Sequence, residues 1–263
     1  MAASILRGTA YITGAGSGIG QFTAYAFARY GVKKMALTDI KSENLETTVS
    51  RLKKEHSDVE VEAIQMDASR EEDVDGSIAQ TVKRFGRLDF AVNNAGIGGP
   101  PKQTTEVELS EWQKLMDVNL NGVWLCQRAQ LRQMLKQDAL SLREGRGTII
   151  NVSSMLGTTA SAPATPATAY TASKHGVMGL TKTDAIFYAP KHIRINAMCP
   201  GYIATPLLKS ATMSGVMRGE LDKVPMGRFG EMEEIADGIV FLASPMSSFM
   251  CGQGLVVDGG YCA

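Results

Sequence analysis

A glycine-rich turn near the N-terminus constrains the fold of this chain more than any other feature. The turn, TGAGSGIG at residues 13–20, follows the apolar run TAYIT at 9–13 and precedes a helical pattern at 19–30. Glycine accepts positive φ and lets a ligand approach the backbone. The amides and the dipole at a helix N-terminus attract phosphate. A strand, this turn and a helix together predict a nucleotide-binding α/β unit, with a tight turn that binds nothing as the simpler alternative.

The rest of the chain alternates short apolar runs with longer amphipathic segments. We expect further strands at 35–39, 61–67, 88–96, 147–154, 193–201 and 254–260. We expect helices at 41–55, 70–85, 110–136, with Ser110 as its N-cap, and 167–188. This alternation implies a parallel sheet with helices on both faces. No linker or repeat marks a second domain, so we predict one doubly wound Rossmann-type α/β domain, residues 1–263, of about seven strands.

Composition argues against several classes of protein. Basic and acidic residues balance at 27 each, so the positive surface of a nucleic-acid-binding protein is not expected. No apolar run approaches the length of about 18 residues that suggests a membrane span, and the N-terminus lacks a secretory signal pattern. The four cysteines and three histidines have no zinc spacing. We therefore expect a cytoplasmic protein with reduced thiols, no metal, and neither nucleic acid nor membrane as a partner.

Asp39 ends the second expected strand, nineteen residues after Gly20. An acidic residue about 20 residues after such a turn accepts hydrogen bonds from the adenosine ribose, and it would repel the 2′-phosphate of NADP. Ser17 and Ile40 offer no cation for a phosphate, whereas Lys41 could swing in. NAD is therefore the expected cofactor and NADP the alternative. Asp39 could also cap the helix that begins near Lys41, and the two roles are compatible.

Tyr170 and Lys174 are four residues apart, directly after a run of Ala, Thr and Pro. On a helix they would share one face, where the positive charge of the lysine favours ionisation of the phenol. Most isolated pairs with this spacing only pack or reach solvent. The interpretation of this pair therefore depends on the other motifs of the chain.

Those motifs occur in a fixed order. Asp67 closes the third strand and is followed by NNAG at 93–96, by DVNLNG around Asn119, by NVSSMLG around Ser154, and by PGYIATP at 200–206. Together with TGAGSGIG and Tyr170-Thr-Ala-Ser-Lys174, they span essentially the whole chain. The sequence resembles the single-domain branch of the short-chain dehydrogenase/reductase family, whose fold binds a dinucleotide.

The resemblance implies the catalytic residues. Tyr170 would be the general acid/base, and Lys174 would lower its pKa and bind the nicotinamide ribose. Ser154 would orient the substrate carbonyl or alcohol, and Asn119 would organise a proton relay to Lys174. Weaker candidates for the last two roles are Ser153 and Asn121.

The resemblance also implies the cofactor-binding residues. Asp67 would meet the adenine amino group, Asn94 and Gly96 would lie beside the cofactor, and Ile203 and Thr205 would meet the carboxamide. The full set is Gly14, Ser17, Gly18, Ile19, Gly20, Asp39, Asp67, Ala68, Asn94, Gly96, Tyr170, Lys174, Ile203 and Thr205.

The implied reaction is hydride transfer between a nicotinamide cofactor and a secondary alcohol or ketone. A substrate lid is expected at about 202–229, where Leu207, Leu208, Met213 and Met217 could line an apolar inner face. Such a face predicts a bulky apolar substrate, although the same residues could equally pack on the rest of the domain or on another subunit. Rival functions are an NADPH-dependent carbonyl reductase and a non-redox scaffold or isomerase.

Two further expectations come from the resemblance. Ser154 and Tyr170 lie sixteen residues apart, a few more than is usual in the family, which weakens any substrate borrowed from known members. The family implies a homotetramer or homodimer, with the helices at 110–136 and 167–188 as the interface. The sequence is also similar to fungal members that act in secondary metabolism.

Overall fold

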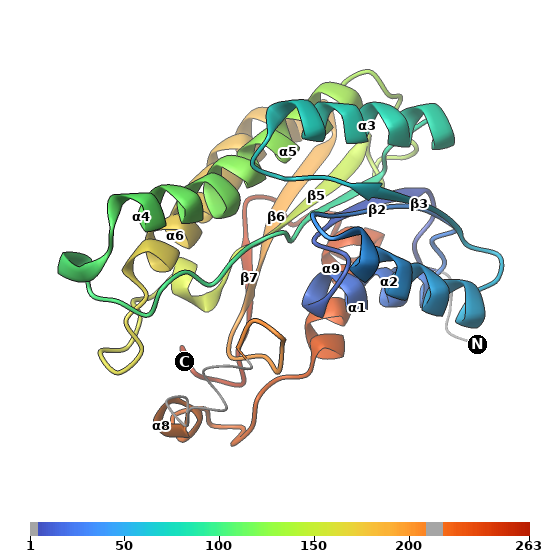
Figure 1. Ribbon diagram of the computed structural model, residues 1–263. Helices are drawn as coiled ribbons and strands as arrows, with labels where there is room; N and C mark the ends of the chain where they lie inside the picture. Colours follow the sequence, from blue (N-terminus) through green and yellow to red (C-terminus); the bar gives the residue numbers. More distant parts are fainter. Residues whose placement is uncertain (1–4, 209–217) are drawn as a thin grey trace.

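The computed structural model describes residues 5–208 and 218–263. In these residues a parallel sheet has the strand order β3-β2-β1-β4-β5-β6-β7 (Figure 1). Its strands are β1 (Thr9–Thr13), β2 (Lys34–Asp39), β3 (Glu60–Gln65), β4 (Phe90–Asn93), β5 (Gly147–Val152), β6 (Ile193–Pro200) and β7 (Gly254–Val257). The chain reverses its direction of winding between β1 and β4, where ligands bind in open sheets of this kind. The predicted doubly wound α/β fold is confirmed.

Helices cover both faces of the sheet (Figure 1). One face carries α1 (Gly18–Arg29), α2 (Ser42–Glu55) and α9 (Met232–Ala243), and the other carries α3 (Glu71–Phe85), α5 (Gly122–Met134) and α6 (Thr168–Tyr188). Two shorter helices are α4 (Leu109–Met116), which packs beside α6, and α8 (Arg218–Leu221), which lies near the C-terminus.

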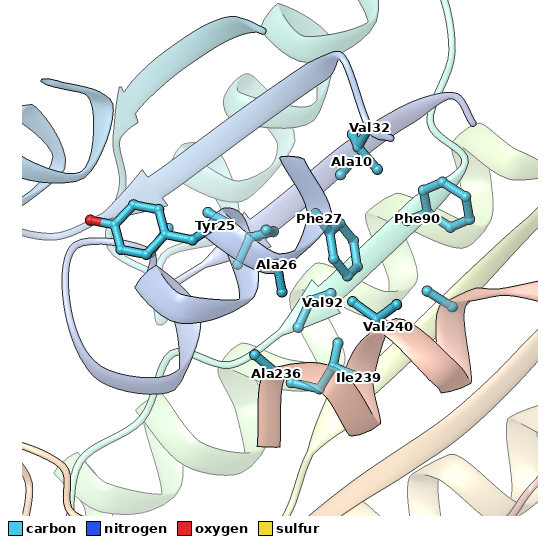
Figure 2. Packing of buried hydrophobic residues seen from close by; sticks show 14 of the residues in the cluster. Ala10, Tyr25, Ala26, Phe27, Val32, Phe90, Val92, Ala236, Ile239 and Val240 are labelled. Atoms are coloured by element: carbon cyan, nitrogen blue, oxygen red, sulfur yellow. The ribbon is translucent and has the colours of Figure 1, made fainter. Parts of the chain in front are cut away.

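The central strands are buried on both faces, which explains why they read as continuous apolar runs. Figure 2 shows Phe27 of α1, Phe90 of β4 and Ile239 of α9 meeting on one side of the sheet. The rings of Phe27 and Phe90 pack edge to face with centroids 6.0 Å apart, an arrangement that aromatic pairs favour. Burying one such side chain contributes roughly 1.5–3 kcal/mol. This core holds the central strands in place, and the loops at their carboxyl ends carry the predicted site residues.

The prediction of one helix at 110–136 that begins at Ser110 is wrong in two respects. This helix is interrupted by a π-helical turn, Asp117–Asn121, between α4 and α5, and Ser110 is not its N-cap. The helix begins at Leu109, and Glu108 and Glu111 form a reciprocal capping box in which each side chain accepts the other's backbone amide. Two carboxylates satisfy more of the first-turn donors than Ser110 could, so the cap lies two residues earlier.

Gly20 and Gly76 are both helical glycines, but their surroundings differ. A Cβ at Gly20 would collide with the carbonyl oxygen of Gly14 and lie 2.5 Å from Asn94 Nδ2, whereas a Cβ at Gly76 meets nothing within 4 Å. We expect Gly20→Ala to lower the free energy of unfolding by on the order of 1–3 kcal/mol. Gly76→Ala should raise it by roughly 0.5–1 kcal/mol. Urea denaturation measures both changes, and similar values for the two variants would contradict the close approach at Gly20.

Candidate functional site

The predicted site residues lie at the carboxyl ends of the parallel strands. The turn after β1 carries Gly14 to Gly20, and Asp39 ends β2. Asn94 and Gly96 follow β4, Ser154 follows β5 and Thr205 follows β6. The carboxyl edge of the sheet therefore brings together motifs that are far apart in sequence, around the crevice between β1 and β4.

The glycine-rich turn has the backbone geometry that its glycines predict. Gly14 has φ 64° and Gly18 has φ 56°, both in the left-handed region that favours glycine. Ser17 is the N-cap of α1, but its side chain makes no capping hydrogen bond. An α-helix leaves its first amides without intrahelical partners, so the start of α1 is suited to a phosphate.

Thr13 joins the two loops at the crevice and is a residue that the sequence analysis missed. Its Oγ1 accepts hydrogen bonds from the backbone amides of Asn94 (2.9 Å) and Ala95 (3.0 Å). In return, Asn94 Nδ2 donates to the carbonyls of Thr13 (3.1 Å) and Gly14 (3.2 Å). The available signal was a polar residue at the end of a buried strand, directly before the glycines.

The same turn is supported from α2. Thr48 Oγ1 donates to the carbonyl of Ala15 at 2.9 Å, and Gln21 Nε2 donates to Thr48 Oγ1 at 2.9 Å and to the carbonyl of Gly16 at 3.3 Å. These side chains hold the outer side of the turn and do not occupy the amides at the start of α1. They were also missed from sequence.

Asp39 binds two backbone amides at the end of β2. Its Oδ2 accepts the amide of Gly16 at 3.0 Å, and its Oδ1 accepts the amide of Lys41 at 3.0 Å. The carboxylate therefore holds the chain as it enters α2, although Lys41 is the N-cap by position. A Cβ at Gly16 would lie 2.8 Å from Asp39 Oδ2, so the contact requires glycine at that position.

Asp67 and Ala68 lie in the turn between β3 and α3. Asp67 Oδ1 accepts hydrogen bonds from the amide (2.9 Å) and the hydroxyl (2.6 Å) of Ser69. Ala68 is buried, and its carbonyl oxygen would lie 3.0 Å from a Cβ placed at Gly122. This turn is thereby fixed between the starts of α3 and α5.

Asn119 is fully buried in the π-helical turn, a kind of bulge that is frequent at functional sites. Its side chain pairs with the backbone of Ile97, accepting from the amide and donating to the carbonyl, both at 2.8 Å. A Cβ at Gly176 would lie 2.8 Å from Leu120 Cδ2, so α6 approaches this turn two residues after Lys174. Asn121 instead bonds Asp117 at the exposed surface.

Ser154, Tyr170 and Lys174 come together from β5 and α6. Ser154 is 8% exposed, and its Oγ accepts the amide of Leu156 at 3.1 Å. The ammonium of Lys174 donates to the carbonyl of Val152 at 2.8 Å and lies 5.5 Å from the centroid of the Tyr170 ring. A hydroxyl, a phenol and an amine thus share one site.

The pKa values of this pair are shifted by burial. Burial raises the pKa of Tyr170 to about 12, although its hydrogen bond with Ser154 acts in the opposite direction. Burial lowers the pKa of Lys174 to about 8. In the chain alone, loss of hydration therefore outweighs the interactions that favour the phenolate, and the lowering of the phenol pKa by Lys174 together with a cofactor stays a prediction.

Ser153 supports the site without belonging to the trio. Its hydroxyl donates to the backbone carbonyl of Lys174 at 3.0 Å, and it is 3% exposed. A Cβ at Gly157 would lie 2.8 Å from that same carbonyl. Ser154 therefore contacts Tyr170, while Ser153 fixes α6 against the end of β5.

The segment after β6 covers the crevice. Pro206 Cδ would lie 3.8 Å from a Cβ at Gly18, and Leu207, which is half exposed, faces Gly98. The side chain of Ile203 is buried in the core, which leaves only its backbone for a ligand. Of the expected inner face, Met213 and Met217 lie outside the described residues.

Other predicted properties can be compared with residues 5–208 and 218–263. Within these ranges no group of three or more His, Cys, Asp and Glu side chains could hold a metal ion. In the same part of the chain, no helix combines the length and the apolar character needed to cross a membrane. Cys126 and Cys199 are buried, Cys251 is half-buried and Cys262 is exposed.

Comparisons with known proteins agree with this geometry. A family model described as enoyl-(acyl carrier protein) reductase matches residues 14–262. The short-chain dehydrogenase srdC of Neurospora crassa is 37% identical over 97% of both chains. The cyclohexanol dehydrogenase of an Acinetobacter strain is 36% identical over 96% of this chain and 94% of its own. The crystal structure of levodione reductase matches with a TM-score of 0.89 and 33% identity over 96% of each chain. The chain belongs to the short-chain dehydrogenase/reductase family of oxidoreductases.

Proposed function

We propose that the protein transfers a hydride between a nicotinamide cofactor and a secondary alcohol or ketone, with Tyr170 as general acid/base. The observation that carries this proposal is the meeting of Ser154, Tyr170 and Lys174 beside a glycine-rich turn whose helix start suits a phosphate. The non-redox alternative would be expected to lose such a trio, and the chain retains all three.

The residues at the sheet edge fit a dinucleotide. Gly14, Ser17, Gly18, Ile19 and Gly20 would hold the pyrophosphate at the start of α1. Asp39 would bind the adenosine ribose, and Asp67 with Ala68 the adenine. The residues on the nicotinamide side would be Asn94, Gly96, Tyr170, Lys174, the Ile203 backbone and Thr205. When bound, the cofactor supplies the hydride chemistry, and the protein supplies position and electrostatics.

The chain's own residues would move the proton. The Ser154 hydroxyl would donate a hydrogen bond to the substrate oxygen and stabilise charge that develops there. A phenol whose pKa is about 12 stays protonated near neutral pH, which suits the acid that completes a carbonyl reduction. To act as base for an alcohol, Tyr170 requires positive charge nearby, and Lys174 is the cation that the chain provides. Asn119 would hold the π-helical turn against α6, the helix that carries Lys174.

The substrate that we propose is a bulky apolar alcohol or ketone. Leu207, exposed on the segment that covers the crevice, supports an apolar wall, and residues 202–208 and 218–229 would form the described parts of a lid. A relative named cyclohexanol dehydrogenase favours a cyclic secondary alcohol as the first compound to test. The fungal relative is in keeping with a role in secondary metabolism, and we retain a cytoplasmic location as part of the proposal.

NAD is the proposed cofactor, because Asp39 carries its charge at the end of β2. An NADPH-dependent carbonyl reductase is the second candidate. It is favoured by the reductase names of the matching family model and of levodione reductase.

We also propose a homotetramer or homodimer. Trp124 on α5 is 44% exposed, and Ile186 and Phe187 on α6 are 76% and 66% exposed. Large apolar side chains gathered on a surface indicate a protein interface, and these lie on the two helices predicted for it. Light scattering would report the mass, and a monomer at micromolar concentration would contradict the proposal.

Replacing Tyr170 with Phe tests the reaction. The variant keeps the ring but cannot exchange a proton, so kcat/KM for cyclohexanol with NAD, and for cyclohexanone with NADH, should fall by about 10²- to 10⁴-fold. Cofactor affinity should stay close to that of the parent. Tyr188→Phe, at the far end of the same helix, is the matched control. Full activity in Tyr170→Phe would rule out the proposed mechanism.

Titration of the protein fluorescence with NADH and with NADPH tests the role of Asp39. NADH should bind more tightly, because the carboxylate repels the extra phosphate. Asp39→Asn removes the charge and should improve NADPH binding by roughly tenfold, an energy of about 1.4 kcal/mol. Asp58→Asn, on the exposed turn after α2, is the control. A parent that prefers NADPH would favour the carbonyl-reductase alternative.

Lys174→Met tests the burial of the amine by its pH dependence. The pKa of Lys174 is about 8 when folded and 10.5 as an ordinary lysine, so the unfolded chain binds more protons between these values. Folding stability from this group therefore rises with pH in that window and is lost as pH falls through the folded pKa. The free energy of unfolding of the parent, relative to Lys174→Met, should increase by about 2 kcal/mol between about pH 7.5 and about 9.5. A flat difference in denaturant titrations would show that the amine is hydrated.

A further inference from the structure

Glu220 is a buried carboxylate in a short surface helix. It lies in α8, near the C-terminus (Figure 1), and is 1% exposed. Its Oε2 accepts a hydrogen bond from the hydroxyl of Tyr261 at 2.6 Å and one from Tyr202 at 3.4 Å, and its Oε1 accepts from Lys223 Nζ at 2.7 Å. A buried carboxylate is stable only when it is paired. Glu220 therefore joins three segments: the exit from β6, residues 218–229 and the C-terminal tail.

The tail is shaped to fit against residues 218–229. Gly259 and Gly260 have φ 67° and 91°, and a Cβ at Gly259 would lie 2.8 Å from Val224 Cγ1. The amide of Met226 donates to the carbonyl of Gly259 at 3.2 Å. Asp258 fixes the turn, since its carboxylate accepts the amides of residues 260 (2.9 Å) and 262 (2.8 Å). The backbone thus presents Tyr261 to Glu220 at a set position.

Two tyrosine rings meet beside this carboxylate. Tyr202 and Tyr261 pack edge to face, with centroids 5.3 Å apart and an interplanar angle of 84°. Tyr202 follows β6. Strand β6 pairs with β5, and Ser154 follows the end of β5. A hydrogen bond with Thr165 also links Tyr202 to the Ala/Thr/Pro loop that lies between Ser154 and Tyr170 in sequence. Tyr202 therefore links the ring pair to the loop between Ser154 and Tyr170 and to the segment after β6.

Charge favours this arrangement at neutral pH. Burial opposes ionisation of Glu220, but hydrogen bonds from Lys223 and from the tyrosines outweigh it and lower its pKa. Burial and the neighbouring carboxylate raise the pKa of Tyr261 well above its ordinary value, so the phenol remains a donor. The Tyr261 hydroxyl donates to Glu220, and the Tyr202 hydroxyl contacts Glu220 and Thr165, so the ring carbons are left for other contacts.

We propose that Glu220 is a positioning residue that holds the Tyr202–Tyr261 ring pair as a fixed aromatic wall of the substrate pocket. The wall selects substrates that carry a flat or cyclic apolar group next to the reacting carbon, because the rings present carbon and their hydroxyls are held by Glu220 and Thr165. This inference deepens the proposed function and rests on it for the substrate class. The hydrogen bond between Glu220 and Tyr261 of the C-terminal tail can be tested without any substrate.

The test uses the full chain with Glu220→Gln, Tyr261→Phe and the double variant. Hydrogen exchange by mass spectrometry should show about tenfold faster exchange in peptides from 218–229 for each single variant, with peptides from β1 and β4 unchanged. The double variant should exchange no faster than either single one, because both changes break the same tie. Tyr188→Phe is the matched control for loss of a phenol.

Steady-state kinetics with cyclohexanol and NAD then separates positioning from general loss of structure. Loss of a fixed wall should raise KM by about fivefold or more and leave kcat within about twofold. Unchanged exchange at 218–229 in both single variants would overturn the proposal, as would a fall in kcat with KM unaltered. If Glu220→Gln does not fold, Tyr261→Phe and Lys223→Gln carry the same comparison. A parent that oxidises no alcohol would overturn the proposed function instead, since hydrogen exchange tests the tie without substrate.

Discussion

The hydrogen bonds between Thr13 and the backbone after β4 are the interaction on which the site depends. Strands β1 and β4 are neighbours, yet the connections that leave them turn toward opposite faces of the sheet. Such a reversal opens a crevice, and a crevice is useful only if its two sides keep a constant separation. Thr13 Oγ1 supplies one acceptor to two amides of the β4 loop, and Asn94 returns two donors to the β1 loop. The glycines then remove the side chains that would fill the space.

The protonation of Tyr170 and Lys174 is governed mainly by burial, because hydrogen bonds and neighbouring charges only partly replace their lost hydration. The sheet edge removes water from Tyr170 and Lys174, and this raises the pKa of one and lowers the pKa of the other. The two pKa values, which are nearly equal in an ordinary tyrosine and lysine, therefore move apart to about 12 and about 8. Burial disfavours the charged form of each group, so the protonation of the pair responds to any charge brought beside it. This responsiveness suits a site that must take up a proton in one direction of reaction and release it in the other.

The sequence predicted features that depend on local pattern. Central strands such as β1 were visible because burial on both faces leaves an unbroken apolar run, and the glycine positions followed from the turn that they form. The π-helical turn was not visible, since it interrupts the 3.6-residue period through pairing of Asn119 with Ile97, 22 residues away. Thr13 and Thr48 were missed for the same reason. Their partners lie 81 and 33 residues away, and a hydroxyl looks the same in sequence whether or not it has a distant partner.

The position of α6 shows why polar contacts matter beneath the site. Apolar packing fixes the position of a helix less sharply than hydrogen bonds do, because the hydrophobic effect is not directional. Asn151 of β5 instead donates to Thr181 of α6 at 2.9 Å and to Gln127 of α5 at 2.7 Å, and Gln127 donates to Asp184 of α6 at 2.7 Å. Hydrogen bonds of this kind, buried and satisfied, specify one arrangement. These bonds fix the position of α6 along β5. Lys174 lies two turns before Thr181 on the same helix, and this position lets its ammonium reach the carbonyl of Val152.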